Sequence, residues 1–271
     1  MSEMDKKEHL KNIQEIRDIF LKKEYYKTVE WLDFLYNNVE NDNPSDYEQD
    51  WKDIISAYEK DLRGFGDYPI NCYIQISSIF RSAIDLGAPK FRSLMLDVYP
   101  YIKDWRMTGQ NLMNISNIAD VLTMNPIARY YFYCFIYLIE IEGSYDNWIK
   151  ILFYLIYNVR SGSIKLEQIE KDYSLRTIKD VMISYGINEV IFGGYENGCL
   201  RNSIAHGQFL YDESTDKMTF KNIHRDIEKY NKEFTFNEFI ELMQKSFTVS
   251  RICSDVLMLL RISDITRIYM K

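Results

Sequence analysis

Apolar residues recur at steps of three and four along most of this chain, and this spacing constrains its fold more than any other feature. Near the N-terminus the pattern runs through Leu10, Ile13, Ile16 and Phe20, which is the spacing of one face of an α-helix. Residues that interrupt helices are scarce, with 11 Gly and 5 Pro among 271 residues. Long periodic segments with few interruptions favour an all-α fold over a many-stranded sheet.

Breaks in this periodicity divide the chain into predicted helices. A first helical segment, capped by Ser2, continues to about Val39, and the stretch around Pro44 ends it. Further helices are predicted at 51–62, 70–86, 91–99, 126–142, 146–159 and 165–184, in a shorter helix leading through 195 to 206, and after residue 235. Because periodicity is weak from 104 to 114, we predict an N-terminal helical domain over residues 1–108 and a second helical domain over residues 109–271.

The segment that follows His206 changes from helical to alternating spacing. Phe209 and Tyr211 alternate with their neighbours, and Met218 and Phe220 do the same after a polar run. This pattern predicts one small β-hairpin. Thr235 with Glu238 three residues later then matches a capping box that begins a long terminal helix. The predicted fold is therefore all-α, a helical bundle with one small β-hairpin.

Charge and cysteine content restrict the functions that the chain can have. Its formal net charge is -7 and its sequence pI is about 5.2, which disfavours non-specific coating of duplex nucleic acid but permits a local basic cleft. The N-terminal residues are polar and do not resemble a secretory signal. The cysteines lie far apart without metal-ligand spacing, which is typical of reduced thiols in a cytoplasmic protein; they are Cys72, Cys134, Cys199 and Cys253.

Two other segments resemble a membrane span and a calcium site, but their length, charges or spacing do not fit either. The segment 127–141 is strongly apolar, but it is shorter than the roughly 20 residues that cross a bilayer and it carries Arg129 and Glu140. We predict that it is a buried core helix and that the protein has no membrane partner. Acidic residues between Glu40 and Asp53 lack the regular spacing of a calcium loop, so no metal site is predicted.

The sequence GCLRNSIAHGQF, residues 198–209, contains the most informative of three histidines. Leu200 and Ile204 are four residues apart and are predicted to form the buried stripe of a short helix. Asn202 and His206 share another face, while Arg201 lies roughly 140° around the helix from His206. The long Arg201 side chain must therefore bend towards the histidine if the two cooperate. Gly207 fits the C′ position that ends such a helix.

This stretch resembles the motif of HEPN domains, in which an arginine and a polar residue precede a histidine by a few residues. RNSIAH supplies Arg201, Asn202 in the polar position and His206. The predicted helices before the motif, the glycine after it, the hairpin and the terminal helix extend the resemblance over roughly residues 126–271. The N-terminal half resembles no family that we recognise.

The resemblance implies RNA cleavage without a metal ion or cofactor. A 2′-hydroxyl attacks the adjacent phosphorus and expels the 5′-oxygen, which leaves a 2′,3′-cyclic phosphate and a 5′-hydroxyl. Histidine titrates near neutral pH, so His206 can accept or donate a proton. Arg201 can fork onto two phosphate oxygens, and Asn202 can orient the imidazole or hold a phosphate oxygen. The alternative is that Arg201 and His206 only cap the helix end.

A second group of polar residues lies near the hairpin. Lys221, His224 and Arg225 form a basic patch that can grip RNA phosphates, although a solvated turn is the competing interpretation. Each chain offers a single well-placed histidine, whereas cleavage needs both a base and an acid. A homodimer that joins two motifs would supply both, and HEPN domains are similar in using paired motifs.

Three functional hypotheses follow from these features. The first is a metal-independent endoribonuclease that acts as a prokaryotic defence or toxin effector, with a cognate antitoxin or regulatory protein as a possible partner. The alternative is a non-catalytic HEPN helical module that binds or regulates another protein. A structural helical protein with a coincidental motif is a more distant third.

Overall fold

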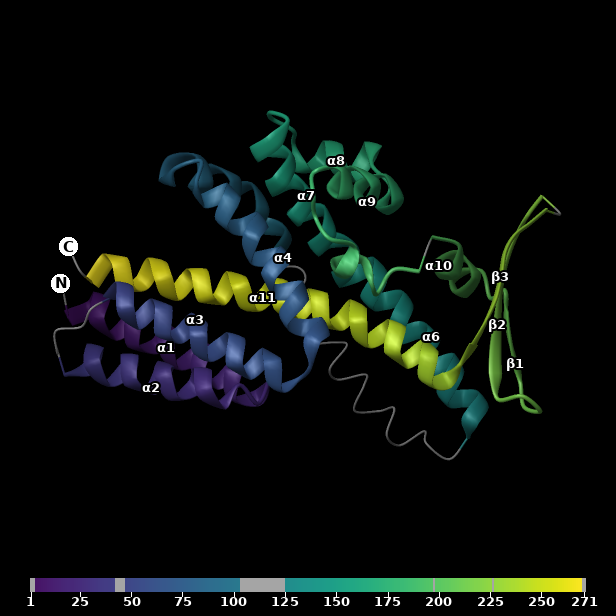
Figure 1. Cartoon of the computed structure of the whole chain (residues 1–271), viewed down its shortest axis with the longest axis horizontal. Helices are drawn as coiled ribbons and strands as arrows, with labels where there is room; N and C mark the ends of the chain where they lie inside the picture. The colour runs from purple at the N-terminus through teal and green to yellow at the C-terminus, as the bar shows by residue number, and fades with distance from the viewer. Residues whose placement is uncertain (1–2, 42–46, 103–124, 197, 226, 270–271) are drawn as a thin grey trace. The chain divides into compact units, whose positions relative to one another are not determined.

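The computed structural model describes residues 3–41, 47–102, 125–196, 198–225 and 227–269 (Figure 1). The chain is mostly helical and carries a small three-stranded antiparallel sheet. The all-α prediction is therefore confirmed in its main part, and the sheet has one strand more than the predicted hairpin. Ser2 and the predicted domain boundary near residue 108 lie outside the described residues.

The chain groups into two compact units. The first unit consists of Met1–Tyr73 together with Ile252–Lys271, and the second consists of Ile74–Arg251. Helix α4 (Asp67–Ile84) begins in the first unit and ends in the second, while α11 (Phe236–Tyr269) begins in the second and ends in the first. The motif and the sheet both belong to the second unit.

The first unit contains a series of adjacent helices. They are α1 (Glu3–Lys22), α2 (Tyr26–Glu40) and α3 (Tyr47–Gly64), with α1 packed on α2 and α2 packed on α3 (Figure 1). The single helical segment predicted to reach Val39 is wrong, because Glu24 adopts a left-handed φ of 60° and separates α1 from α2. The buried Asp61 carboxylate of α3 then accepts the backbone N–H groups of Lys27 and Thr28 at 3.2 and 2.8 Å, which caps the new helix.

A buried carboxylate fastens the C-terminal part of α11 to this unit. Asp255 is fully buried and accepts the hydroxyl groups of Tyr25 and Tyr58 at 3.2 and 3.0 Å. It also forms an ion pair with Lys23. A buried charge is tolerated where it is paired and hydrogen-bonded, as it is here.

The second unit is built mainly from helices that follow one another along the chain. It includes the end of α4, the beginning of α11 and a helix over residues 88–102. Its other helices and turns are α6 (Pro126–Glu140), the π-helical turn η2 (Ile141–Tyr145), α7 (Asp146–Arg160), α8 (Leu166–Asp172), α9 (Leu175–Ser184), the 3₁₀ turn η3 (Glu189–Phe192) and α10 (Gly198–Ala205). The helix predicted over residues 165–184 is two helices, because the Ser174 hydroxyl accepts the N–H of Thr177 and begins α9 separately.

Helix α6 is not the wholly buried core helix that its composition predicts. Tyr130, Cys134 and Tyr137 are buried, but Phe135 is 58% exposed and Ile139, one turn later, is 36% exposed. The helix therefore has one face in the core and one apolar face at the surface. Within the described parts of the chain, no helix combines the length and apolarity needed to cross a membrane.

The sheet follows the motif helix. Its strands β1 (Phe209–Asp212), β2 (Lys217–His224) and β3 (Ile227–Thr235) pair in that order, and Phe209 lies opposite Phe220. Met218 and Phe220 are fully buried, as the alternating pattern predicts. Strand β3 is the strand that the predicted two-stranded hairpin lacks.

The predicted capping box begins α11. The Glu238 carboxylate accepts the N–H of Thr235 at 2.8 Å, and the Thr235 hydroxyl accepts the N–H of Glu238 at 3.3 Å. Both bonds of the capping box are therefore present, and the prediction is confirmed.

Three close contacts fix the chain just before the motif helix. The hydroxyl of Tyr145 donates to the carbonyl of Ile191 at 2.8 Å, and the hydroxyl of Tyr137 donates to the carbonyl of Gly194 at 3.3 Å. Gly194 also lies so close to the backbone of Ser246 on α11 that a Cβ at this position would overlap it. Residues of α6, η2 and α11 therefore set where α10 begins.

Candidate functional site

The motif occupies α10 and the turn that ends it. Leu200 and Ile204 are buried, as their spacing predicts. Gly207 has a φ of 64°, donates its N–H to the Ile204 carbonyl at 3.0 Å, and is followed by Gln208, which donates to the Ser203 carbonyl at 2.7 Å. These two bonds define a Schellman ending. They confirm Gly207 at the C′ position and leave His206 exposed at the end of the helix.

Arg201 is held by two polar partners. Its Nε lies 2.5 Å from a carboxylate oxygen of Glu142, and its Nη1 donates to the Asn202 side-chain oxygen at 2.9 Å. The Arg201 and Glu142 side chains are 43% and 44% exposed, so solvent reaches both. A guanidinium has five N–H donors. Three of them have no hydrogen-bond partner among the residues that the structure describes.

The structure brings Arg201 and Asn202 together but leaves His206 apart from them. No side-chain hydrogen bond links the His206 imidazole to either residue within the described ranges, and the bond between Asn202 and His206 is a backbone helix bond of 2.9 Å. The arginine bends towards Glu142 instead of towards the histidine. All three motif side chains nevertheless remain at least partly exposed on one helix of eight residues and its ending turn.

Glu142 is the residue of this site that the sequence did not indicate. It lies in η2, the π-helical turn through which α6 continues into α7. Such turns are uncommon and occur often at functional sites. The sequence EIEGSYD contains no proline, and its Gly143-Ser144 pair does not indicate that Glu142 would meet a residue of α10.

The tyrosines around the start of α10 are unsuited to proton transfer near neutral pH. Burial raises the pKa of Tyr195, and the nearby Asp146 and Cys199 raise it further. Burial is also the main cause of the raised pKa values of Tyr137 and Tyr230. These hydroxyl groups therefore stay protonated near neutral pH.

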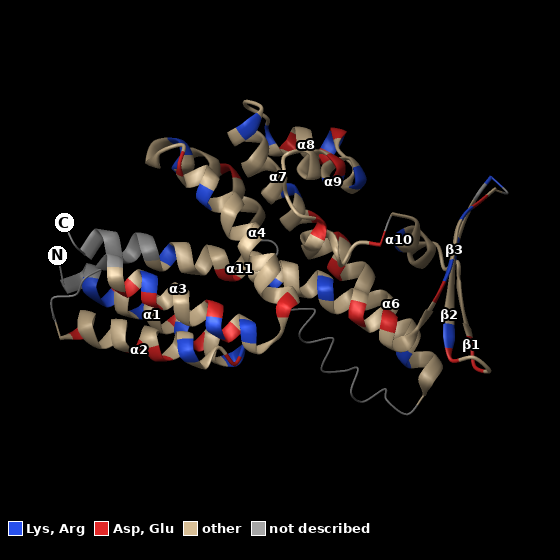
Figure 2. Cartoon of the chain, viewed as in Figure 1, with Lys and Arg blue, Asp and Glu red and all other residues tan. Residues whose placement is uncertain are grey.

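The predicted basic patch lies on β2 and the turn after it. Lys221 and Arg225 are exposed, and the backbone of His224 ends the strand. Figure 2 shows Lys and Arg residues towards the free end of the β2–β3 hairpin. The backbone N–H of Lys221 donates to the carbonyl of Gln208 at 2.8 Å, two residues after His206. The patch is therefore tied to the end of the motif through the backbone.

Arg129 and Glu140, which are unusual in an apolar helix, have partners outside the motif. The Arg129 guanidinium lies 4.0 Å from the centre of the Phe236 ring. Glu140 is 1% exposed and accepts the hydroxyl of Ser250 on α11 at 2.6 Å. Burial raises the pKa of Glu140 to about 8, and the Ser250 hydrogen bond lowers it only in part.

The raised pKa of Glu140 should make the folded protein less stable as the pH rises. Its folded pKa of about 8 lies above the ordinary value of 4.5. Its contribution is therefore fully present below pH 4.5 and is lost as pH rises towards 8, by at most about 1.4 kcal/mol per pH unit. We expect Glu140→Gln to flatten this loss in urea unfolding between about pH 5 and 8. The exposed control Glu170→Gln should keep the wild-type slope, and an unchanged slope in Glu140→Gln would contradict the assignment.

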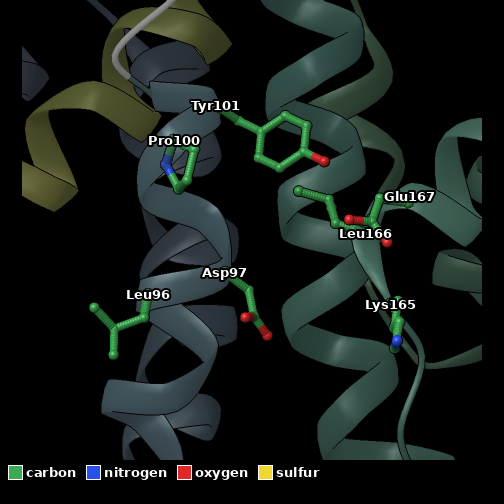
Figure 3. Close-up of a pocket in the computed structure, with 7 residues that line it drawn as sticks. All are labelled: Leu96, Asp97, Pro100, Tyr101, Lys165, Leu166 and Glu167. Carbon is green, nitrogen blue, oxygen red and sulfur yellow. The ribbon is translucent and has the colours of Figure 1, made fainter.

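A hollow of about 600 Å³ lies elsewhere in the second unit (Figure 3). It is lined by residues of the helix 88–102 and by residues at the start of α8, and the Asp97 carboxylate at its edge accepts the hydroxyl of Tyr154 at 2.6 Å. None of the predicted site residues lines it. Among the described residues, no three His, Cys, Asp or Glu side chains are grouped so that they could hold a metal ion.

No protein family matches this chain, and neither a curated protein nor a solved structure is similar enough to count as a match.

Proposed function

We propose that this protein is a metal-independent endoribonuclease of the HEPN type, with Arg201, Asn202 and His206 in its site. One observation carries the proposal. The half-exposed Arg201 of α10 is held by Asn202, its neighbour on the same helix, and by Glu142 of η2. The same helix ends at the exposed His206. A held cation and an exposed imidazole, both carried by one short helix and its ending turn, are the groups that the proposed phosphodiester cleavage uses.

Each motif residue has a role in the proposed reaction. The RNA 2′-hydroxyl loses its proton and attacks the adjacent phosphorus, while the bond to the 5′-oxygen breaks and that oxygen gains a proton. His206 accepts or donates one of these protons. Arg201, through the N–H groups that Glu142 and Asn202 leave unoccupied, stabilises the charge on the phosphate oxygens. The products are a 2′,3′-cyclic phosphate end and a 5′-hydroxyl end.

The reaction is proposed to take place in a homodimer. A single chain supplies one well-placed histidine, and two-fold pairing of α10 would place two copies of the motif in one cleft. The exposed apolar face of α6, with Phe135 and Ile139, supports this proposal because η2, which directly follows α6, carries Glu142. A second copy would cover this face and would gather positive charge in a protein of net charge -7.

We also propose a role in the cell. A ribonuclease of this kind would act in the cytoplasm of a prokaryote as a defence or toxin effector. An antitoxin or regulatory protein would be needed to restrain it until infection or stress, because indiscriminate RNA cleavage stops growth.

Purified protein should cleave RNA in the presence of EDTA and leave 2′,3′-cyclic phosphate ends. The physical reason is that the imidazole and the guanidinium provide both proton transfer and charge stabilisation without a metal ion. Fragments from total RNA would be tested for cyclic phosphate by their resistance to phosphatase before, but not after, acid treatment. Activity that EDTA abolishes and magnesium restores would refute this mechanism.

The second candidate function is a non-catalytic binding module. The pairing of Arg201 with Glu142 favours it, because a carboxylate beside the guanidinium offsets the charge that would attract a phosphate. The same EDTA experiment separates the two candidates, since a binding module leaves RNA intact at every protein concentration.

A further inference from the structure

The hairpin formed by β2 and β3 continues beyond the end of the third strand. Strand β1 begins at Phe209 opposite Phe220, so the later residues of β2 pair only with β3 (Figure 1). We refer to the described residues 221–225 and 227–231 of this two-stranded extension as the arm. A β-bulge between Asn222 and Ile223 interrupts its register. An isolated two-stranded ribbon is only marginally stable in water, so its direction depends on how its base is held.

Gln208 holds the base of the arm with both its backbone and its side chain. Its N–H completes the ending of α10 on Ser203, and its carbonyl accepts the N–H of Lys221 at 2.8 Å. Its side-chain oxygen accepts the N–H of Ile223 at 3.1 Å, and its side-chain nitrogen donates to the carbonyl of Ile223 at 3.4 Å. One residue therefore joins the end of the motif helix to two positions of β2.

Strand geometry explains why a glutamine serves here. Alternate residues of a strand direct their N–H and C=O groups towards the same edge, so Ile223 points these groups to the same side as Lys221. Strand β1 begins only at Phe209, opposite Phe220, so no β1 residue lies beside Ile223, whose register partner on the other side is Glu228 of β3. The primary amide of Gln208 offers one donor and one acceptor, as a peptide group does.

The arm carries cations without ion-pair partners. Lys221, Arg225 and Lys229 are exposed, and none forms an ion pair among the described residues. In contrast, Lys217 and Lys232 at the base of the hairpin pair with Glu233 and Glu196 at 3.4 and 2.7 Å. The one arm carboxylate in the described part, Glu228, accepts a hydrogen bond from Asn231 at 3.3 Å. Unpaired cations on an exposed ribbon are suited to bind phosphates.

From this arrangement we infer that the arm is the docking element for single-stranded RNA, and that Gln208 is the positioning residue that aims it from the motif. The inference rests on the proposed function, because the strand that the arm guides is the one that His206 and Arg201 would cleave. RNA phosphates bind Lys221, Arg225 and Lys229, and Gln208 fixes these cations relative to His206, two residues away in the chain.

Binding of uncleavable RNA tests the arm separately from cleavage. A 2′-O-methyl oligoribonucleotide lacks the attacking hydroxyl, and its Kd can be measured by fluorescence anisotropy over a range of salt concentrations. A triple variant replaces the arm cations together: Lys221→Ala, Arg225→Ala and Lys229→Ala. It should bind more weakly, and the plot of log K against log salt should become less steep by about 2. The reason is that each phosphate contact on a single strand contributes about 0.7 to the steepness. Gln208→Leu, which has similar volume but no amide, should raise Kd about tenfold by loss of preorganisation.

A combined variant distinguishes positioning from a general loss of stability. If Gln208 acts by aiming the arm, Gln208→Leu should have no further effect on Kd once the three arm cations are absent. Amide exchange at Ile223 should be faster in Gln208→Leu, while exchange at Thr219, inside the paired ladder, stays unchanged. Gln168→Leu, an exposed glutamine on α8, serves as the control and should match the wild type.

Two results would overturn the inference. One is a wild-type Kd in the arm variant, and the other is a full tenfold loss from Gln208→Leu that persists when the arm cations are absent. A failure of the proposed function would give a different result from a failure of the inference about the arm. A protein that binds the 2′-O-methyl strand through the arm but never cleaves ordinary RNA would refute the endoribonuclease while leaving the docking element in place.

Discussion

His206→Ala is expected to lower the rate of RNA cleavage by about 10²–10⁴-fold, the usual contribution of a general acid or base. The imidazole is exposed at the end of α10 and has no side-chain hydrogen bond among the described residues, so its removal should leave the fold intact. Gly207 and Gln208, which end the helix through backbone bonds, remain in the variant. Rates would be measured on an RNA oligonucleotide under single-turnover conditions, after circular dichroism has shown that the variant is folded.

Arg201→Ala belongs to the same experiment and should lose activity over a similar range, through lost stabilisation of phosphate charge. Its ion pair with Glu142 is substantially exposed, and such pairs add at most about 1 kcal/mol to stability. The loss of rate should therefore far exceed any loss of stability. Arg201→Lys keeps the charge but not the fork, so it should recover only part of the rate.

The other two histidines provide controls. His9→Ala changes a residue of α1 in the first unit and should be silent. His224→Ala, at the end of β2, should change RNA binding more than rate. A folded His206→Ala protein with full activity would exclude the catalytic assignment, whatever the other variants show.

Local patterns in the sequence predicted much of the second unit, because they depend on neighbours in the chain. Leu200 and Ile204 are buried since residues four apart share a helical face. Gly207 ends α10 since a glycine adopts a left-handed conformation without strain. The capping box of Thr235 and Glu238 is likewise a local device.

Features that depend on distant residues were not predictable in the same way. Strand β3 buries Phe234 but leaves most of its residues exposed, so the sequence shows no alternation there. Only pairing with β2 makes it a strand. Glu142 reaches Arg201 because a π turn places it beside α10, and the amide of Gln208 bonds to Ile223 because β1 begins only at the next residue, Phe209. Each of these contacts joins residues that are separated in the chain, so no local spacing pattern predicts it.

The exposed face of α6 also depends on distant residues, because they decide which apolar side chains are covered. The composition of residues 127–141 correctly excludes a polar surface helix but cannot show which apolar side chains lack cover. Phe135 and Ile139 lie one turn apart, and both are exposed. The proposed pairing with a second copy uses this face.

Mixing active and inactive chains should show whether the site is composite. Wild-type chains would be co-refolded with increasing excess of His206→Ala chains, and cleavage would be measured per wild-type chain. If the site needs a base from one copy and an acid from its partner, each mixed dimer lacks one proton-transfer group, and activity per wild-type chain should fall steeply as mixed dimers replace wild-type pairs. Refolding wild-type chains with the same excess of wild-type protein controls for the refolding yield.

A second substitution tests the face of α6 through which the two copies are proposed to pair. Phe135→Arg places a charge at the centre of the exposed face of α6, so it should shift sedimentation from dimer to monomer and abolish cleavage while the helical content stays unchanged. Gln168→Arg, on the exposed side of α8, adds the same charge away from that face and should alter neither property. Constant activity per wild-type chain in the mixing series, or an active monomer in sedimentation, would show instead that each chain carries its own complete site. In that case a single imidazole with Arg201 and water must perform both proton transfers, and the apolar face of α6 must bind something other than a second copy.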